Sequence, residues 1–99
     1  FILSYFNQSV TDQKFEITQL KNISLGGMCF VTTRKYEHHT QLGIELKTPY
    51  LAGTTYLEGM VLGSQEKMKD SIYETRLQFK ELKPDAKVLL EKLIDLFVE

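Results

Sequence analysis

At its single pair of adjacent glycines the chain reads Asn22-Ile23-Ser24-Leu25-Gly26-Gly27. Short polar side chains bond to nearby backbone groups, and glycine accepts backbone conformations that other residues avoid, so this composition is typical of a turn. Apolar and polar residues alternate before the segment, over residues 15–20, and a short apolar run follows it over residues 28–33. Alternation and β-branched or aromatic runs both predict strands. The segment is therefore expected to join two strands.

Four further stretches predict strands, which brings the expected number to six. They are residues 1–6, 42–46, 55–64 and 71–81. Polar residues, prolines and glycines predict turns or loops between them. These fall at residues 7–13, 34–41, 48–50, 53 and 65–70. In the last strand the alternation assigns Glu74, Arg76 and Gln78 to one face, and Thr75 and Leu77 to the other.

The C-terminal segment, residues 84–98, predicts one helix. Pro84 suits a first helical turn, and Asp85 complements the positive end of the helix dipole. Apolar residues recur at helical spacing and form one stripe that faces the strands. The stripe consists of Ala86, Leu89, Leu90, Leu93 and Phe97, broadened by Val88, Ile94 and Leu96. The expected fold is one mostly β domain over residues 1–99, a six-stranded barrel or sandwich followed by a helix.

Composition narrows the class of protein. Twelve Lys and Arg balance thirteen Asp and Glu for a net charge of −1, which argues against a nonspecific nucleic-acid binder. No apolar run approaches the roughly 20 residues that span a bilayer. The single cysteine, Cys29, forms no internal disulfide and indicates a reducing compartment, so a cytoplasmic location is expected. Only two cations are arginines, Arg34 and Arg76.

The segment that begins at Asn22 fits the pattern D/N-x-S-x-x-G, and here the sequence resembles the PilZ domain, the bacterial receptor module for the second messenger cyclic di-GMP. A strand of the Met28-Cys29-Phe30-Val31 type follows, as in the family, and Phe79-Lys80-Glu81-Leu82 resembles the family's closing F-x-x-L. A terminal helix like residues 84–98 is similar to the tail of flagellar-brake PilZ proteins. The resemblance covers nearly the whole chain. It implies a six-stranded antiparallel β-barrel of PilZ type, split-barrel-like, with one C-terminal helix.

The resemblance also implies a cyclic di-GMP site at Asn22, Ser24, Gly26 and Gly27. The Asn22 side-chain oxygen can accept from the donors on the Watson–Crick edge of guanine, and the Ser24 hydroxyl can both donate and accept. The two glycines lack Cβ, so their backbone can approach a ligand closely. The family carries Asp or Asn at the first position, and the neutral Asn22 predicts weaker pairing than a carboxylate would give.

Function and partners follow from the same resemblance. The chain is expected to be a sensor that binds cyclic di-GMP, orders an N-terminal arm over it and so changes its protein contacts. The expected protein partner belongs to the motility, pilus or exopolysaccharide machinery, and no DNA, RNA, membrane span or resident cofactor is expected. No acid/base pair, catalytic triad or metal set can be assembled from the sequence, so an enzyme is not expected.

One half of the family's cyclic di-GMP site has no counterpart in this sequence. The family places an R-x-x-x-R segment just before the first strand, where its arginines clamp phosphates and reach guanine acceptors. This sequence has no arginine before Arg34; Lys14 and Lys21 are the only cations upstream of Asn22. We expect residues 1–99 to be the C-terminal domain or a fragment of a longer chain, with the arginines preceding Phe1. Residues 1–99 alone are then expected to bind the nucleotide weakly or undetectably. The alternative is a degenerate PilZ domain that binds a protein partner and no nucleotide.

Simpler interpretations stand beside these. The motif could be a plain Gly-Gly turn capped by its Asn and Ser side chains. An oligosaccharide or single-strand binder on an OB-like barrel rests only on the strand number and the aromatic content. His38-His39 is expected in a solvated loop with diverging side chains and no metal, and Cys29 in the core. Arg76 either borders a ligand or forms an ion pair with Glu74 or Glu58.

Overall fold

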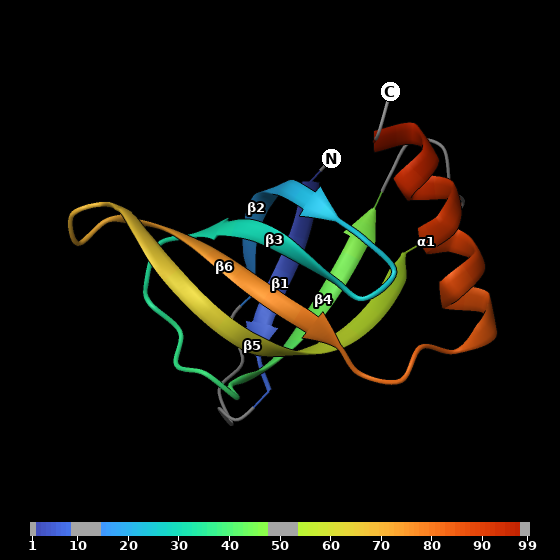
Figure 1. Cartoon of the computed structure of the whole chain (residues 1–99), viewed down its shortest axis with the longest axis horizontal. Helices are drawn as coiled ribbons and strands as arrows, with labels where there is room; N and C mark the ends of the chain where they lie inside the picture. The colour runs from blue at the N-terminus through green and yellow to red at the C-terminus, as the bar shows by residue number, and fades with distance from the viewer. Residues whose placement is uncertain (1, 9–14, 48–53, 98–99) are drawn as a thin grey trace.

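The computed structural model describes residues 2–8, 15–47 and 54–97, with side chains to residue 95. The elements are β1 (Ile2–Asn7), β2 (Glu16–Ile23), β3 (Gly27–Thr32), β4 (Gln41–Lys47), β5 (Thr55–Met68), β6 (Ile72–Phe79) and α1 (Pro84–Phe97). The strands close into a barrel in the order β1-β2-β3-β6-β5-β4, and every neighbouring pair is antiparallel (Figure 1). This confirms the predicted six-stranded antiparallel barrel with one C-terminal helix.

The barrel interior is filled by alternate residues of the strands. Phe30, Leu42, Ile44 and Val61 are fully buried, as expected where one face of each strand points inward. In β6 the inward residues include Thr75, at 0% exposure, which confirms the predicted division of that strand into two faces. The inward apolar side chains form one contiguous core.

At the start of β2 the apolar residues face solvent. Ile17 is 75% exposed and Phe15 is 52% exposed, whereas the alternate residues Glu16, Thr18 and Leu20 point inward. The polar inward residues have partners: the Tyr5 hydroxyl donates to Glu16 Oε2 at 2.6 Å, and Thr18 Oγ1 donates to the Val31 carbonyl at 2.7 Å. These hydrogen bonds satisfy the two polar side chains on the inward face of β2.

The β5–β6 hairpin is longer than predicted. The sequence predicts a loop at residues 65–70, but β5 continues to Met68, which pairs with Ile72. Residues 65–68 are exposed, since this part of the hairpin extends beyond the barrel wall, and polar side chains are therefore compatible with a strand (Figure 1). The turn is only three residues long, and Asp70 adopts a left-handed φ of 58°.

The other predicted turns have different outcomes. The loop after β3 is confirmed and covers residues 33–40. Asn7 belongs to β1 and Gln8 is a turn residue, while residues 9–13 of the predicted turn lie outside the described residues. The described residues also exclude four predicted turn residues, Thr48, Pro49, Tyr50 and Gly53. They exclude Phe1 and the side chains of Leu96 and Phe97 as well.

Helix α1 packs at the end of the barrel where the β2–β3 turn emerges (Figure 1). Leu90 and Leu93 are at most 1% exposed and join the barrel core, with Ala86 and Ile94 packed against it. Val88, predicted to broaden the stripe, is 52% exposed and points outward. No helix of the described residues is long and apolar enough to cross a membrane.

Candidate ligand-binding groove

The turn between β2 and β3 is held by one serine. The Ser24 amide donates to the Gly27 carbonyl at 2.8 Å, and the Ser24 hydroxyl oxygen accepts from the amides of Gly26 and Gly27 at 3.2 and 3.3 Å. The same hydroxyl lies 3.4 Å from the Gly27 carbonyl, its acceptor. Local capping by Ser24 is therefore present, and it fixes the conformation of the motif.

The last glycine of the motif is required by packing. A Cβ at Gly27 would lie 2.0 Å from the carbonyl oxygen of Leu77, because β3 and β6 approach closely there. The Gly26 carbonyl in turn accepts from the Phe79 amide at 2.9 Å, which connects the turn to the end of β6. At Gly26 the nearest contact of a Cβ would be Ser24 Oγ at 3.9 Å, so this position faces open space.

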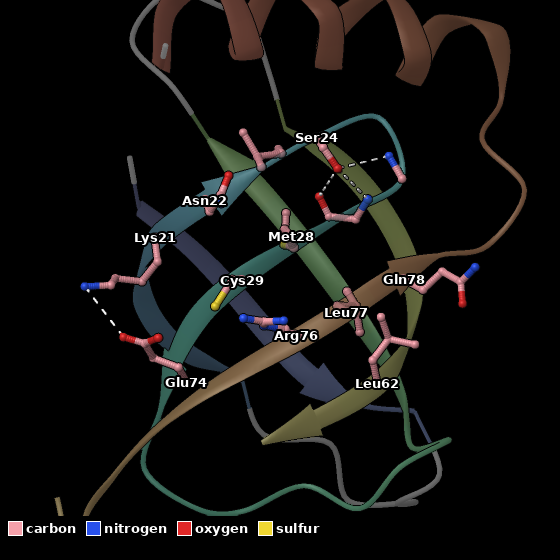
Figure 2. Close-up of a pocket in the computed structure, with 13 residues that line it drawn as sticks. Lys21, Asn22, Ser24, Met28, Cys29, Leu62, Glu74, Arg76, Leu77 and Gln78 are labelled. Atoms are coloured by element: carbon pink, nitrogen blue, oxygen red, sulfur yellow. Dashed lines mark hydrogen bonds and ion pairs between the residues drawn. The ribbon is translucent and has the colours of Figure 1, made fainter. Parts of the chain in front are cut away.

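Asn22 stands in a row of outward residues that crosses three strands. It lies opposite Cys29 on β3, and Cys29 lies opposite Arg76 on β6 (Figure 2). The pairing of β2 with β3 shifts register between Leu20 and Asn22, which brings Asn22 into this row. A second shift in β5, between Val61 and Gly63, places Leu62 beside the row at 47% exposure. Such β-bulges redirect side chains next to functional sites in many proteins.

These residues line an open groove of about 770 Å³ on the outer surface of the barrel (Figure 2). Its lining comes from β2, β3, β5, β6 and the motif turn. It comprises Lys21, Asn22, Ile23, Ser24, Gly26, Gly27, Met28, Cys29, Leu62, Glu74, Arg76, Leu77 and Gln78. The structure thus brings all four predicted site residues, Asn22, Ser24, Gly26 and Gly27, to one groove; their contact with a ligand stays a prediction.

The charges around the groove are mostly paired with each other. Glu74 lies 3.8 Å from Lys21 Nζ and 3.9 Å from Lys67 Nζ. Arg76, in contrast, forms no ion pair with any described residue, although its side chain is exposed in the groove. The groove therefore carries an arginine whose charge is available to a ligand.

Cys29 is not a core residue, and that expectation is wrong. It is half-buried on the outer face, because Met28 and Phe30 on either side of it point inward. Burial raises the pKa of its thiol, and the neighbouring Glu74 carboxylate raises it further. The thiol is therefore neutral at physiological pH and forms part of the groove floor.

The sequence interpretation missed Lys21, Leu62 and Gln78 as groove residues and left Arg76 undecided. Alternation already placed Gln78 and Arg76 on one face of β6, which was a usable signal. Leu62 had no such signal, because its outward position results from the bulge in β5.

The histidine pair lies in the loop after β3, as expected, but its side chains do not diverge. The two rings stack with centroids 3.9 Å apart, since His39 adopts a left-handed φ of 74°. Among the described residues no group of three His, Cys, Asp or Glu side chains is placed to hold a metal ion.

Comparison with known proteins gives the family. Residues 6–96 match the family model of the PilZ domain, and no curated protein matches the chain. The Bacillus subtilis inhibitor of motility MotI/DgrA has a similar structure, with a TM-score of 0.72 at 17% identity over 98% of this chain and 47% of that one. MrkH of K. pneumonia in complex with c-di-GMP gives a TM-score of 0.70 at 21% identity over 97% of this chain and 47% of that one.

At these identities the solved structures show a shared fold, and the chain spans about half the length of each. The family assignment rests on the match of residues 6–96, which includes the groove and the whole of β2 to β6. The chain belongs to the PilZ domain family.

Proposed function

We propose that the chain is a bacterial, cytoplasmic sensor domain that binds cyclic di-GMP in the groove around the β2–β3 turn. One observation carries the proposal: Asn22, Ser24, Gly26 and Gly27 all open into a single groove of about 770 Å³. Small-molecule sites in proteins have volumes of roughly 300–1,000 Å³, and this groove falls in that range. The function is binding rather than catalysis.

The geometry of the β2–β3 turn suggests separate roles for Ser24 and Asn22 in ligand binding. A serine hydroxyl has two acceptor lone pairs and one donor. In Ser24 the two acceptor positions serve the amides of Gly26 and Gly27, whereas the donor makes only a 3.4 Å contact with the Gly27 carbonyl. Ser24 can therefore hold the turn and still donate to a ligand oxygen. Asn22 is exposed on β2 and supplies a side-chain acceptor for the guanine donors.

The proposed output is a change in protein contacts on binding. Two of the similar structures are described as an inhibitor of motility and as a complex with c-di-GMP, which supports a role in second-messenger control of motility or surface structures. The expected partner is a protein of the motility, pilus or exopolysaccharide machinery.

The proposal is tested by titrating the ¹⁵N-labelled chain with cyclic di-GMP and following its amide shifts, a method that detects weak binding. We expect saturable shifts at residues 22–29 and 76–78, with weak affinity because no arginine precedes Arg34. The double variant Asn22→Ala, Ser24→Ala should lose most of this response. No shift at millimolar nucleotide would overturn the proposal. Equal binding by the double variant would remove the site assignment but leave the ligand.

A second candidate function is a protein-binding adaptor that has lost the nucleotide. Exposed apolar side chains outside the groove lining favour it, since Ile2, Phe15, Ile17 and Tyr56 are 46–75% exposed. Exposed apolar groups of this kind mark protein contact surfaces. The same titration separates the two functions, because an adaptor of this type gives no shifts in the groove at any nucleotide concentration.

A further inference from the structure

The role of Arg76 could not be decided from the sequence. Two alternatives were open: it borders a ligand, or it pairs with Glu74 or Glu58. The ion-pair alternative is not realised in the described residues, because Glu74 is engaged by Lys21 and Lys67, and Glu58 lies 3.8 Å from Lys80 Nζ. An exposed guanidinium with five donors thus borders the groove and has no ion-pair partner among the residues that the structure describes.

The strand register sets the distance between Arg76 and Asn22. Both are in the row Asn22–Cys29–Arg76, and neighbouring strands are about 4.8 Å apart, so the two backbones are separated by roughly 10 Å. Between them lies Cys29, a small, half-buried side chain. This spacing leaves room for a flat ring over Cys29, with polar groups at both of its edges.

The floor and flank of this space suit a purine. Figure 2 shows Leu62 on the β5 side of Arg76, where its exposed side chain forms an apolar flank of the groove beside the guanidinium. The Cys29 thiol is neutral at physiological pH, because burial and Glu74 raise its pKa, and so it behaves as a small apolar group.

We propose that a guanine of cyclic di-GMP lies over Cys29, with its Watson–Crick donors toward Asn22 and its O6 and N7 acceptors bound by the fork of Arg76. The inference rests on the proposed function and assigns base selection to a residue of β6. Arginine pairs bidentately with O6 and N7 of guanine, whereas adenine presents the N6 amino donor in place of O6. Arg76 therefore selects guanine over adenine.

The test compares cyclic di-GMP with cyclic di-AMP on the wild-type chain and on the variants Arg76→Gln and Arg76→Lys, using amide-shift titrations. The wild type should prefer the guanine nucleotide by about tenfold or more. Both variants should lose about tenfold for cyclic di-GMP and change little for cyclic di-AMP, because lysine keeps the charge but not the planar fork. Lys80→Gln removes an equal charge outside the groove and should bind like the wild type.

Each outcome has one meaning. Binding of cyclic di-GMP by Arg76→Gln at the wild-type level would overturn the assignment of Arg76 while the proposed function stands. Arg76→Lys could instead bind both nucleotides like the wild type while Arg76→Gln weakens the binding of both nucleotides equally. That result would show that Arg76 contacts a phosphate, and it would overturn base selection by Arg76. Absence of binding by the wild type would overturn the proposed function itself. Arg76 is exposed, so unchanged amide spectra of the free variants will verify that they fold.

Discussion

At the scale of single residues, the adjacent glycines Gly26 and Gly27 of the motif have different roles. Gly27 lies against the backbone of β6, where a Cβ would stand 2.0 Å from the Leu77 carbonyl oxygen, whereas Gly26 faces open space. We expect Gly27→Ala to lower the free energy of unfolding by about 2–3 kcal/mol, as overpacking does, and Gly26→Ala to change it by less than about 0.5 kcal/mol. Chemical denaturation measures both. Equal effects of the two substitutions would show that β3 and β6 are not in this close contact.

The thiol of Cys29 provides a prediction about pH. Burial and the Glu74 carboxylate raise its pKa, and only the thiolate reacts with alkylating reagents. The alkylation rate of the folded chain should therefore rise through its midpoint at a higher pH than that of the same chain unfolded in urea. Glu74→Gln should move the midpoint of the folded chain back down. A folded midpoint at or below the unfolded one would contradict the environment described for Cys29.

Local chemistry explains which site residues the sequence predicted. The turn from Asn22 to Gly27 could be predicted from the sequence because the hydrogen bonds of Ser24 that hold it form within six residues. Arg76 reaches the same groove only through the pairing of β3 with β6, and Leu62 only through a bulge in β5. Register between distant strands is a tertiary property, so no local pattern predicts it.

At the scale of elements, helix α1 depends on a narrow apolar stripe. Leu90 and Leu93 are at most 1% exposed against the barrel core, while Val88 of the same helix is 52% exposed. Leu90→Ala should lower the free energy of unfolding by about 2–5 kcal/mol, whereas Val88→Ala should change it by less than about 0.5 kcal/mol. Urea denaturation followed by far-ultraviolet circular dichroism measures both. Similar small effects of the two substitutions would mean that α1 does not pack on the barrel.

The predictions for individual elements succeeded where burial of alternate side chains sets the apolar–polar pattern of the sequence. Strand β4 is predicted by its alternation because its inward residues Leu42, Ile44 and Leu46 fill the core. The last four residues of β5 escaped prediction because residues 65–68 contact solvent and no burial pattern marks them as strand. Alternation over residues 15–20 predicted strand β2 but not its buried face, because Glu16 and Thr18 are inward polar residues with hydrogen-bond partners.

At the scale of the whole molecule, closure of the barrel creates the groove. Strand β6 pairs with β3 as well as β5, so the N-terminal motif turn and the C-terminal part of the sheet lie side by side (Figure 1). The fold class was predictable from six strand signals and one helix signal. The groove was not, because it needs the order in which the strands close.

A nucleotide bound in this groove would cover Cys29, the single cysteine of the chain, which lies on the groove floor. The measurement is the rate of Cys29 alkylation by N-ethylmaleimide with and without saturating cyclic di-GMP. We expect bound nucleotide to slow the alkylation of Cys29 several-fold, and half of this slowing should occur at the nucleotide concentration that gives half of the amide-shift change. In the variant Cys29→Ser, Ile17→Cys the thiol stands outside the groove lining, on β2 opposite Ser4 of β1, and its alkylation rate should not change when the nucleotide is added. An unchanged Cys29 rate at saturating nucleotide, or equal slowing in that variant, would contradict the account.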